Sequence, residues 1–223
     1  MKNLLLSLVV LFTSTAALAY DRADDVERLQ SGATVLHEIM AAPDSGVPDE
    51  IMHDAKCIAV IPSMAKAAFV VGGAYGKGVA SCRTGHGWSA PAFFSIKGGS
   101  FGFQIGGQAA DIIMVIMNDQ GMENLLSSKF KLGADASVAA GPVGRHADAS
   151  TDWKLRAQVL TYSRTRGIFA GISLNGAVIT QHKDDTREFY GHMIPFRTIL
   201  TGKIEAPRDA EIWQGALVKY CGK

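Results

Sequence analysis

The sequence predicts an α+β fold: a mainly antiparallel, glycine-rich β-sheet or barrel-like core with flanking N- and C-terminal helices. Short apolar segments separated by glycines fill the middle of the 223-residue chain, a pattern typical of antiparallel strands. Helical periodicity is strongest near the two ends. Because strands do not alternate with long helical segments, a parallel sheet built from strand–helix–strand units is not expected.

The first nineteen residues have the layout of a secretory signal peptide. Met1–Asn3 carries a positive charge, an apolar run follows to Leu18, and Ala17 and Ala19 supply the small residues read by signal peptidase. Cleavage is expected to leave one domain over residues 20–223, in the periplasm or outside the cell if the host is bacterial, with peripheral attachment to the outer membrane as one option. The alternative is an uncleaved anchor, although the apolar run is near the lower limit for crossing ~30 Å of hydrocarbon.

The elements of the first half follow from periodicity and turn residues. Residues 22–42 are expected to form a helix because apolar residues recur at steps of three and four, and Asp49 can cap a short second helix. The apolar segment 57–61 is expected to be a strand that stops at Pro62. The glycine-rich stretch 72–77 is expected to turn the chain sharply. Further strands are expected at residues 67–71, 78–83, 91–97 and 100–106.

In the second half, residues 111–117 are apolar after their first position and are expected to form a buried strand. Asn118 and Asp119 can cap a short helix that ends at Leu126. Asn175-Gly176 is expected to be a tight hairpin turn between the last two strands. The other expected strands are 130–139, 156–164, 167–173 and 176–180, and the expected helices are 184–191 and 207–220.

Charge gives little support for nucleic-acid binding. Removing Lys2 with the leader leaves 21 basic and 21 acidic residues, whereas nucleic-acid binders are usually strongly basic. The balance is uneven along the chain: residues 20–56 hold nine acidic and three basic side chains, and the remainder holds twelve acidic and eighteen basic ones. An acidic N-terminal segment therefore precedes a mildly basic body.

Motifs for catalysis and cofactor binding are missing from the sequence. Residues 73–78 lack the spacing of a P-loop and the helix that must follow it, and residues 102–108 lack dinucleotide-binding spacing. The six histidines form neither a zinc-protease motif nor a compact ligand set. A nucleophile elbow is also missing. No catalytic residue, cofactor or metal is therefore expected, and the chain is not expected to be an enzyme.

Basic residues near the glycine-rich segments are the candidate binding residues. Phosphate-bearing lipid headgroups favour Lys and Arg beside exposed backbone amides. The alternative, left open by the sequence, is that these charges are dispersed over the surface. The candidates are Lys66, Lys77, Arg83, Lys129, Lys131, Arg164 and Arg166.

Three cysteines allow at most one internal disulfide, which an oxidising compartment would favour. Cys57 opens the first expected strand and Cys82 closes the third, so antiparallel pairing could bring them within bonding range. Cys221 lies near the chain end and is expected to stay free. The alternative is three reduced thiols.

Several long segments, in the right order, resemble the SYLF domain family, also called DUF500 or the Ysc84 actin-binding domain. The resemblance covers about residues 30–191. The segments are 57–62, 66–78, 87–93, 102–108, 131–144, 162–176 and 190–191.

The resemblance implies a non-enzymatic lipid-binding protein that recognises anionic or phosphate-bearing headgroups, because eukaryotic members of the family bind phosphoinositides. The alternative it implies is a structural or host-facing protein-interaction module, since some members bind and bundle actin. The chain departs from the family pattern in two respects. The N-terminal helix that is basic in eukaryotic members begins here with the acidic segment Asp21–Glu27. An exported protein would also meet neither cytoplasmic actin nor phosphoinositides in its own cell.

Overall fold

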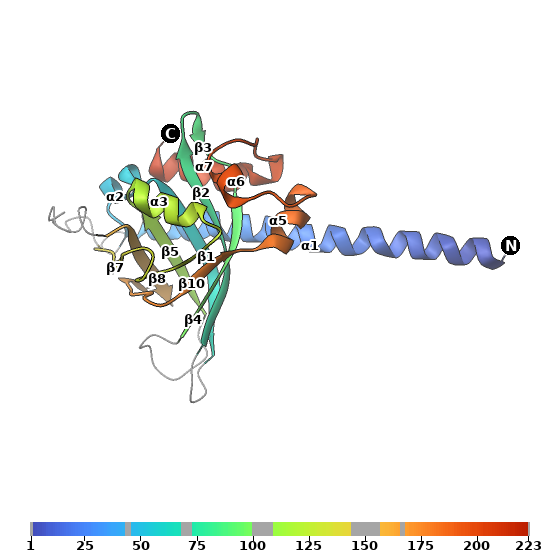
Figure 1. Cartoon of the computed structure of the whole chain (residues 1–223), viewed down its shortest axis with the longest axis horizontal. Helices are drawn as coiled ribbons and strands as arrows, with labels where there is room; N and C mark the ends of the chain where they lie inside the picture. Colours follow the sequence, from blue (N-terminus) through green and yellow to red (C-terminus); the bar gives the residue numbers. More distant parts are fainter. Residues whose placement is uncertain are drawn as a thin grey trace.

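The computed structural model describes residues 2–42, 46–67, 73–99, 109–143, 157–165 and 168–222. A curled mixed sheet forms a half-barrel at the centre of the molecule (Figure 1). Its strands are β1 (Cys57–Ala67), β2 (Gly73–Thr84), β3 (Gly87–Trp88), β4 (Ala92–Gly99), β5 (Ala110–Ile116), β6 (Lys129–Lys131), β7 (Val138–Ala140), β8 (Val159–Thr165), β9 (Ile168–Gly171) and β10 (Val178–Gln181). They pair in the order β6-β10-β4-β2-β1-β5-β8-β7, with β3 beside β2 and β9 beside β8. The α+β prediction is confirmed.

Helices cover both faces of the sheet and bury a separate apolar core on each. The helices are α1 (Lys2–Ala41), α2 (Asp49–Asp54), α3 (Asp119–Leu126), α5 (Lys183–Tyr190), α6 (Phe196–Leu200), η1 (Arg208–Ala210) and α7 (Glu211–Cys221). One core packs α1, α2, α5 and α7 on the sheet, and the other packs α3 and α6 on the opposite face. Figure 1 shows the first part of α1 extending away from the body. Among the described residues, no helix combines the length and apolar character needed to cross a membrane.

The second half of α1 is held on the sheet by α7. Leu29 and Leu36 of α1 are fully buried, as the periodicity of the helix predicts. Trp213 of α7 is also fully buried, and its indole nitrogen donates a 2.9 Å hydrogen bond to Ser81 Oγ in β2. A side chain at Gly32 would lie only 3.2 Å from the Trp213 ring, so glycine permits the two helices to approach closely.

Local sequence signals predicted β5 and α3 correctly. β5 is apolar throughout its interior because it is buried on both faces between β1 and β8. Asn118 caps α3, since its side-chain oxygen accepts a 2.9 Å hydrogen bond from the Gly121 backbone N–H.

The expectation that Pro62 ends the first strand is wrong. β1 continues to Ala67, and its pairing with β5 shifts register between Ile61 and Met64. Ser63 adopts a φ of 51° inside this irregular stretch, which is characteristic of a bulge. The bulge accommodates a proline, which cannot donate to the ladder, so Ala67 belongs to β1 rather than opening a new strand.

The glycines at 73–78 lie within β2, so the predicted turn there is also wrong for these residues. Gly76 and Gly78 permit close packing: a Cβ at Gly76 would come within 2.5 Å of the Ile61 side chain, and one at Gly78 within 2.6 Å of the Val60 carbonyl oxygen and 2.5 Å of the Phe94 ring. Gly98 and Gly99 likewise end β4 as strand residues. Residues 68–72 and the strand expected at 100–106 lie outside the described residues.

The predicted strand over residues 130–139 is two strands, which lie at opposite edges of the sheet. β6 pairs with β10, whereas β7 pairs in parallel with β8. The predicted hairpin at Asn175-Gly176 is a turn, with a 3.1 Å hydrogen bond from Ala177 N to Leu174 O, but it does not join paired strands. β9 pairs with β8, and β10 pairs with β4 and β6. The helix α6 had no counterpart among the expected elements.

Cys57 and Cys82 form a disulfide between β1 and β2. The two residues are direct register partners, with their Cα atoms 3.9 Å apart. Cys221 is free and buried at the end of α7, and burial raises the pKa of its thiol to about 12. A thiol with so high a pKa is a poor nucleophile.

Candidate functional site

Lysines from two strands, β4 and β6, share one face of the sheet near its β6 edge. Lys131 of β6 pairs with Val178 of β10, Val178 with Lys97 of β4, and Lys97 with Tyr75 of β2. Directly paired residues point to the same face of a sheet, so these side chains form a row. The neighbouring row starts at Lys129, which the structure exposes like Lys97 and Lys131.

We call Tyr75, Lys97, Lys129 and Lys131 the basic strip. The Lys97 ammonium lies 5.5 Å from the centre of the Tyr75 ring, within cation–π range. Tyr75 is 42% exposed, which is unusual for a large aromatic side chain on a sheet. The strip thus presents three cations and one aromatic ring to solvent.

Two of these residues were predicted and two were missed. Lys129 and Lys131 flank the buried Phe130, an exposed–buried–exposed alternation that indicates a half-buried strand. Lys97 ended the expected strand 91–97 and Tyr75 fell in the expected turn 72–77, but neither was named as a binding residue. Apolar and polar residues alternate from Phe94 to Lys97, which was the signal available for Lys97. Which residues lie beside Lys97 in the sheet depends on strand order, which no local pattern gives.

The other candidate lysines do not join the strip. Lys77 lies on the same face as Tyr75, but its ammonium is 2.9 Å from Asp185 Oδ1 of α5. Lys66 belongs to β1 and pairs with Ala74, not with a residue of the strip. Arg166 lies outside the described residues.

Arg83 is a structural anchor for two helix ends. Its guanidinium donates to the carbonyls of Ala55 at 2.8 Å and His53 at 2.9 Å, and also to that of Cys221. The same group lies 4.8 Å from the centre of the Trp88 ring. The last carbonyls of a helix have no partner within it, so Arg83 satisfies those of α2 and α7 together.

Arg164 forms ion pairs within the molecule. Its guanidinium lies 2.6 Å from Asp111 Oδ2 in β5, and it also pairs with Glu38 of α1. Burial raises the pKa of Asp111, although a hydrogen bond from the Ser63 N–H opposes the shift. The predicted patch therefore does not form one site, because Lys77 pairs with Asp185, and Arg83 and Arg164 hold elements of the fold together.

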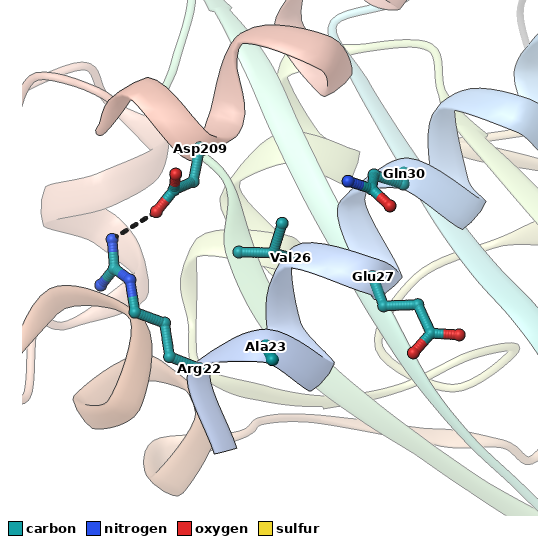
Figure 2. A pocket seen from close by; sticks show the side chains of 6 residues that line it. All are labelled: Arg22, Ala23, Val26, Glu27, Gln30 and Asp209. Carbon is teal, nitrogen blue, oxygen red and sulfur yellow. Dashed lines mark hydrogen bonds and ion pairs between the residues drawn. The ribbon is translucent and has the colours of Figure 1, made fainter. Parts of the chain in front are cut away.

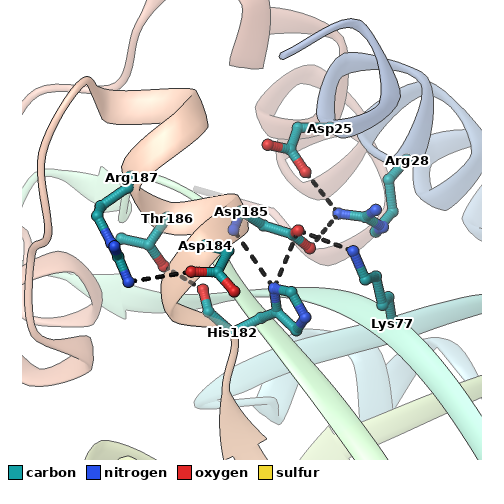
Figure 3. Close-up of polar contacts among 8 residues, drawn as sticks. All are labelled: Asp25, Arg28, Lys77, His182, Asp184, Asp185, Thr186 and Arg187. Atoms are coloured by element: carbon teal, nitrogen blue, oxygen red, sulfur yellow. Dashed lines mark hydrogen bonds and ion pairs between the residues drawn. The ribbon is translucent and has the colours of Figure 1, made fainter. Parts of the chain in front are cut away.

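A buried polar cluster joins α1, β2 and α5 (Figure 3). Arg28 of α1 lies between two carboxylates, 2.7 Å from Asp25 Oδ1 and 2.8 Å from Asp185 Oδ2. His182 Nδ1 lies 2.9 Å from Asp185 Oδ1, the oxygen that Lys77 also contacts.

Burial and these neighbours separate the pKa values of the two carboxyls. Burial first, and then the Asp185 charge, raise the pKa of Asp25 to about 7. Burial alone would raise the pKa of Asp185, but hydrogen bonds from His182 and Lys77 and the charge of Arg28 lower it to about 2.

The same cluster contains the carboxylates that come closest to a cation-binding arrangement among the described residues. Carboxylate oxygens of Asp25, Asp185 and Glu188 lie within 4.8 Å of one another. Both Asp185 oxygens, however, already contact cationic side chains. Arg28 and Lys77 therefore already supply the positive charge that a metal ion would bring to the Asp185 oxygens.

An open groove of about 580 Å³ runs beside α1 (Figure 2). Arg22 forms one wall and is tied to Asp209 of η1 by a 2.7 Å ion pair. Val26, Glu27 and Gln30 line the opposite side. These lining residues do not include a serine, threonine, cysteine or histidine, so the groove lacks a hydroxyl or thiol nucleophile and a histidine base.

Sequence comparisons identify the kind of protein that carries this sheet. Residues 97–220 match the model of the Ysc84 family, described as "Las17-binding protein actin regulator". The chain belongs to the Ysc84 family. The matched range contains Lys97, Lys129 and Lys131 of the basic strip, together with α5 and the His182 and Asp185 members of the buried polar cluster. The description names a binding partner and a regulatory function, but no reaction.

Curated relatives include SH3 domain-containing YSC84-like protein 1 and Protein YSC84. The former, from Rattus norvegicus, is 36% identical over 171 residues, which is 76% of this chain and 50% of the relative. The latter, from Saccharomyces cerevisiae, is 31% identical over 172 residues, which is 75% of this chain and 36% of the relative. This Ysc84-family chain thus spans half or less of these curated relatives.

Proposed function

We propose that this chain is a non-enzymatic protein-interaction module that docks its basic strip against an acidic protein surface. The observation that carries the proposal is the convergence of Lys97 of β4 with Lys129 and Lys131 of β6, from two separate parts of the sequence, on one exposed sheet face. Clustered cations favour a partner of opposite charge and accelerate its capture. The family description as an actin regulator supports an actin-type filament as the probe.

Co-sedimentation with actin filaments tests this proposal. The variant Lys97→Glu/Lys131→Glu reverses two charges of the strip and should lower filament binding at least tenfold, with the loss decreasing as salt is raised. The control Lys203→Glu/Arg208→Glu makes the same change in net charge at two exposed positions of the C-terminal region. Equal binding by both variants, or no sedimentation of the wild-type chain at micromolar concentration, would reject the proposal.

A second candidate function is binding to an anionic lipid surface. The exposed ring of Tyr75 beside Lys97 favours it, because an aromatic ring with a polar tip suits the membrane interface and each nearby lysine contributes ~1 kcal/mol on an anionic bilayer. Flotation should then show binding to vesicles of phosphatidylcholine with anionic phosphatidylglycerol, and none to phosphatidylcholine alone. Tyr75→Ser should weaken vesicle binding. Binding that survives both Tyr75→Ser and Lys97→Glu/Lys131→Glu would exclude the strip as a lipid site.

We also propose that the chain is exported, with cleavage after Ala19. A disulfide between Cys57 and Cys82 suits an oxidising compartment. Cleavage would place Asp21 and Asp24 in the first turn of the shortened α1, where acidic residues stabilise the helix dipole. The intact mass of the protein isolated from its host distinguishes a chain beginning at Tyr20 from the full-length chain. If export is correct, the physiological partner is a protein or lipid met outside the cytoplasm.

A further inference from the structure

The buried polar cluster in Figure 3 attaches α1 to α5 at the first turns of α1 that pack against the sheet. Asp25 and Asp185 are 1% and 2% exposed, respectively. Arg28 lies between them and is the direct link between their carboxylates. Ion pairs this deeply buried are costly to leave incompletely neutralised.

The cations around Asp25 are shared unequally. α1 contributes Arg28, β2 contributes Lys77, and α5 with its capping residue contributes His182, Asp185 and Glu188. Arg28 is divided between Asp25 and Asp185, whereas Lys77 contacts Asp185, so among the described contacts an ionised Asp25 has less positive charge beside it than Asp185 has.

One oxygen of Asp25 lacks compensation altogether. Among the residues that the structure describes, the buried Asp25 Oδ2 has no hydrogen-bond partner, whereas Oδ1 accepts from Arg28. A proton on Oδ2 would remove one negative charge and make that atom a hydrogen-bond donor inside a cluster of carboxylate oxygens.

We propose that Asp25 and Asp185 form a proton-operated clasp, which holds α1 against α5 while Asp25 carries a proton and loosens when Asp25 loses it. Asp185 is the fixed anion of the clasp, because three cationic or donor side chains hold it ionised. Asp25 is the titrating half, and its raised pKa near 7 agrees with the geometry. A proton fits the free oxygen better than a metal ion, because Arg28 and Lys77 already occupy both oxygens of Asp185.

Loosening would act on a defined part of the surface. Arg22, Val26 and Glu27 belong to the same turns of α1 and line the open groove of Figure 2. Release of Asp25 would free these residues to move away from η1, where Arg22 now pairs with Asp209. The clasp thus links the protonation of one buried carboxyl to the shape of a groove on the surface.

The sign of the pH effect follows from the direction of the shift. The folded protein holds the Asp25 proton more tightly than the unfolded chain, so this group stabilises the fold at low pH and the stabilisation is lost as pH rises through about 7. Tm should fall by about 3–5 °C between pH 6 and pH 8 because of this group. Amides of residues 22–30 should lose protection over the same range, after correction for intrinsic exchange rates.

Asp25→Asn tests the clasp because it imitates the protonated carboxyl. Its Tm and its exchange protection at residues 22–30 should become nearly independent of pH between 6 and 8. The matched control is Asp24→Asn, which removes the same charge one position earlier at an exposed site and should keep the wild-type pH dependence. Asp185→Asn should destabilise the protein at every pH in the range.

Three results would overturn the proposal. An Asp25→Asn variant with the wild-type pH dependence would show that another group titrates. Stabilisation of the wild-type chain, but not of Asp25→Asn, by Ca²⁺, Mg²⁺ or Mn²⁺ would make the cluster a cation site instead. Unchanged protection of residues 22–30 from pH 6 to 8 would show that α1 does not loosen.

Discussion

Replacing Arg83 by Lys tests whether a basic residue near the glycine-rich strands binds a ligand or holds the fold together. The change keeps the positive charge but removes the planar fork of the guanidinium. Arg83 contacts the carbonyl oxygens of Ala55 and His53 at 2.8 and 2.9 Å, and it reaches Cys221 at the end of α7. A single ammonium cannot reproduce this arrangement.

The expected loss can be worked out from these contacts. A hydrogen bond from a charged donor contributes ~1.5–3 kcal/mol, and lysine can retain about one of the bonds that Arg83 makes. The stacking of Arg83 over Trp88 at 4.8 Å adds ~0.5–1 kcal/mol. Since neighbouring contacts are not additive, we expect a loss of about 2–3 kcal/mol in the free energy of unfolding, or a fall of about 5–10 °C in Tm.

Urea denaturation of the Arg83→Lys protein measures its stability, and vesicle flotation of the same preparations measures its lipid binding. The control is Arg187→Lys, because Arg187 pairs with Asp184 while both side chains are more than half exposed. That change should alter stability by no more than ~0.5 kcal/mol. An Arg83→Lys protein with unchanged stability and reduced vesicle binding would refute the structural assignment and restore Arg83 as a ligand-binding residue.

Two further predictions concern the disulfide and one turn. Peptide mapping without reduction should recover Cys57 linked to Cys82 and Cys221 free, and reduction should lower stability by ~3 kcal/mol in the chain-entropy model; a linked peptide containing Cys221 would contradict this pairing. Gly176→Val should lower the free energy of unfolding by ~1–2 kcal/mol, because Gly176 has a φ of 84°. Gly215→Ala should be neutral or stabilising, because Gly215 lies in the interior of α7 with open space around it. Thermal denaturation measures both effects. Equal effects of the two glycine changes would show that backbone conformation does not set the cost at Gly176.

The predictable part of this fold is the part determined by nearby residues. The cap at Asn118, the apolar run of β5 and the periodicity of α1 are each determined by residues a few positions apart in the sequence. Each was predicted correctly. β1 was cut short because Pro62 normally ends a strand, whereas pairing with both β2 and β5 carries the chain through the bulge. The parallel pairing of β7 with β8 was missed because no local pattern distinguishes it from a continuation of β6.

The same distinction explains the candidate site, where the type of charge was visible in the sequence but its partners were not. Arg83 and Lys131 are both basic residues beside glycine-rich or apolar segments. The carbonyl groups that hold Arg83 belong to residues 30 and 138 positions away, so only the folded chain reveals its structural function. Lys131 and Lys97, by contrast, become neighbours because β10 enters the sheet between β6 and β4. A basic residue on this sheet is therefore available for a partner when strand order leaves it without a nearby carboxylate or helix end. That condition is set by topology, not by composition.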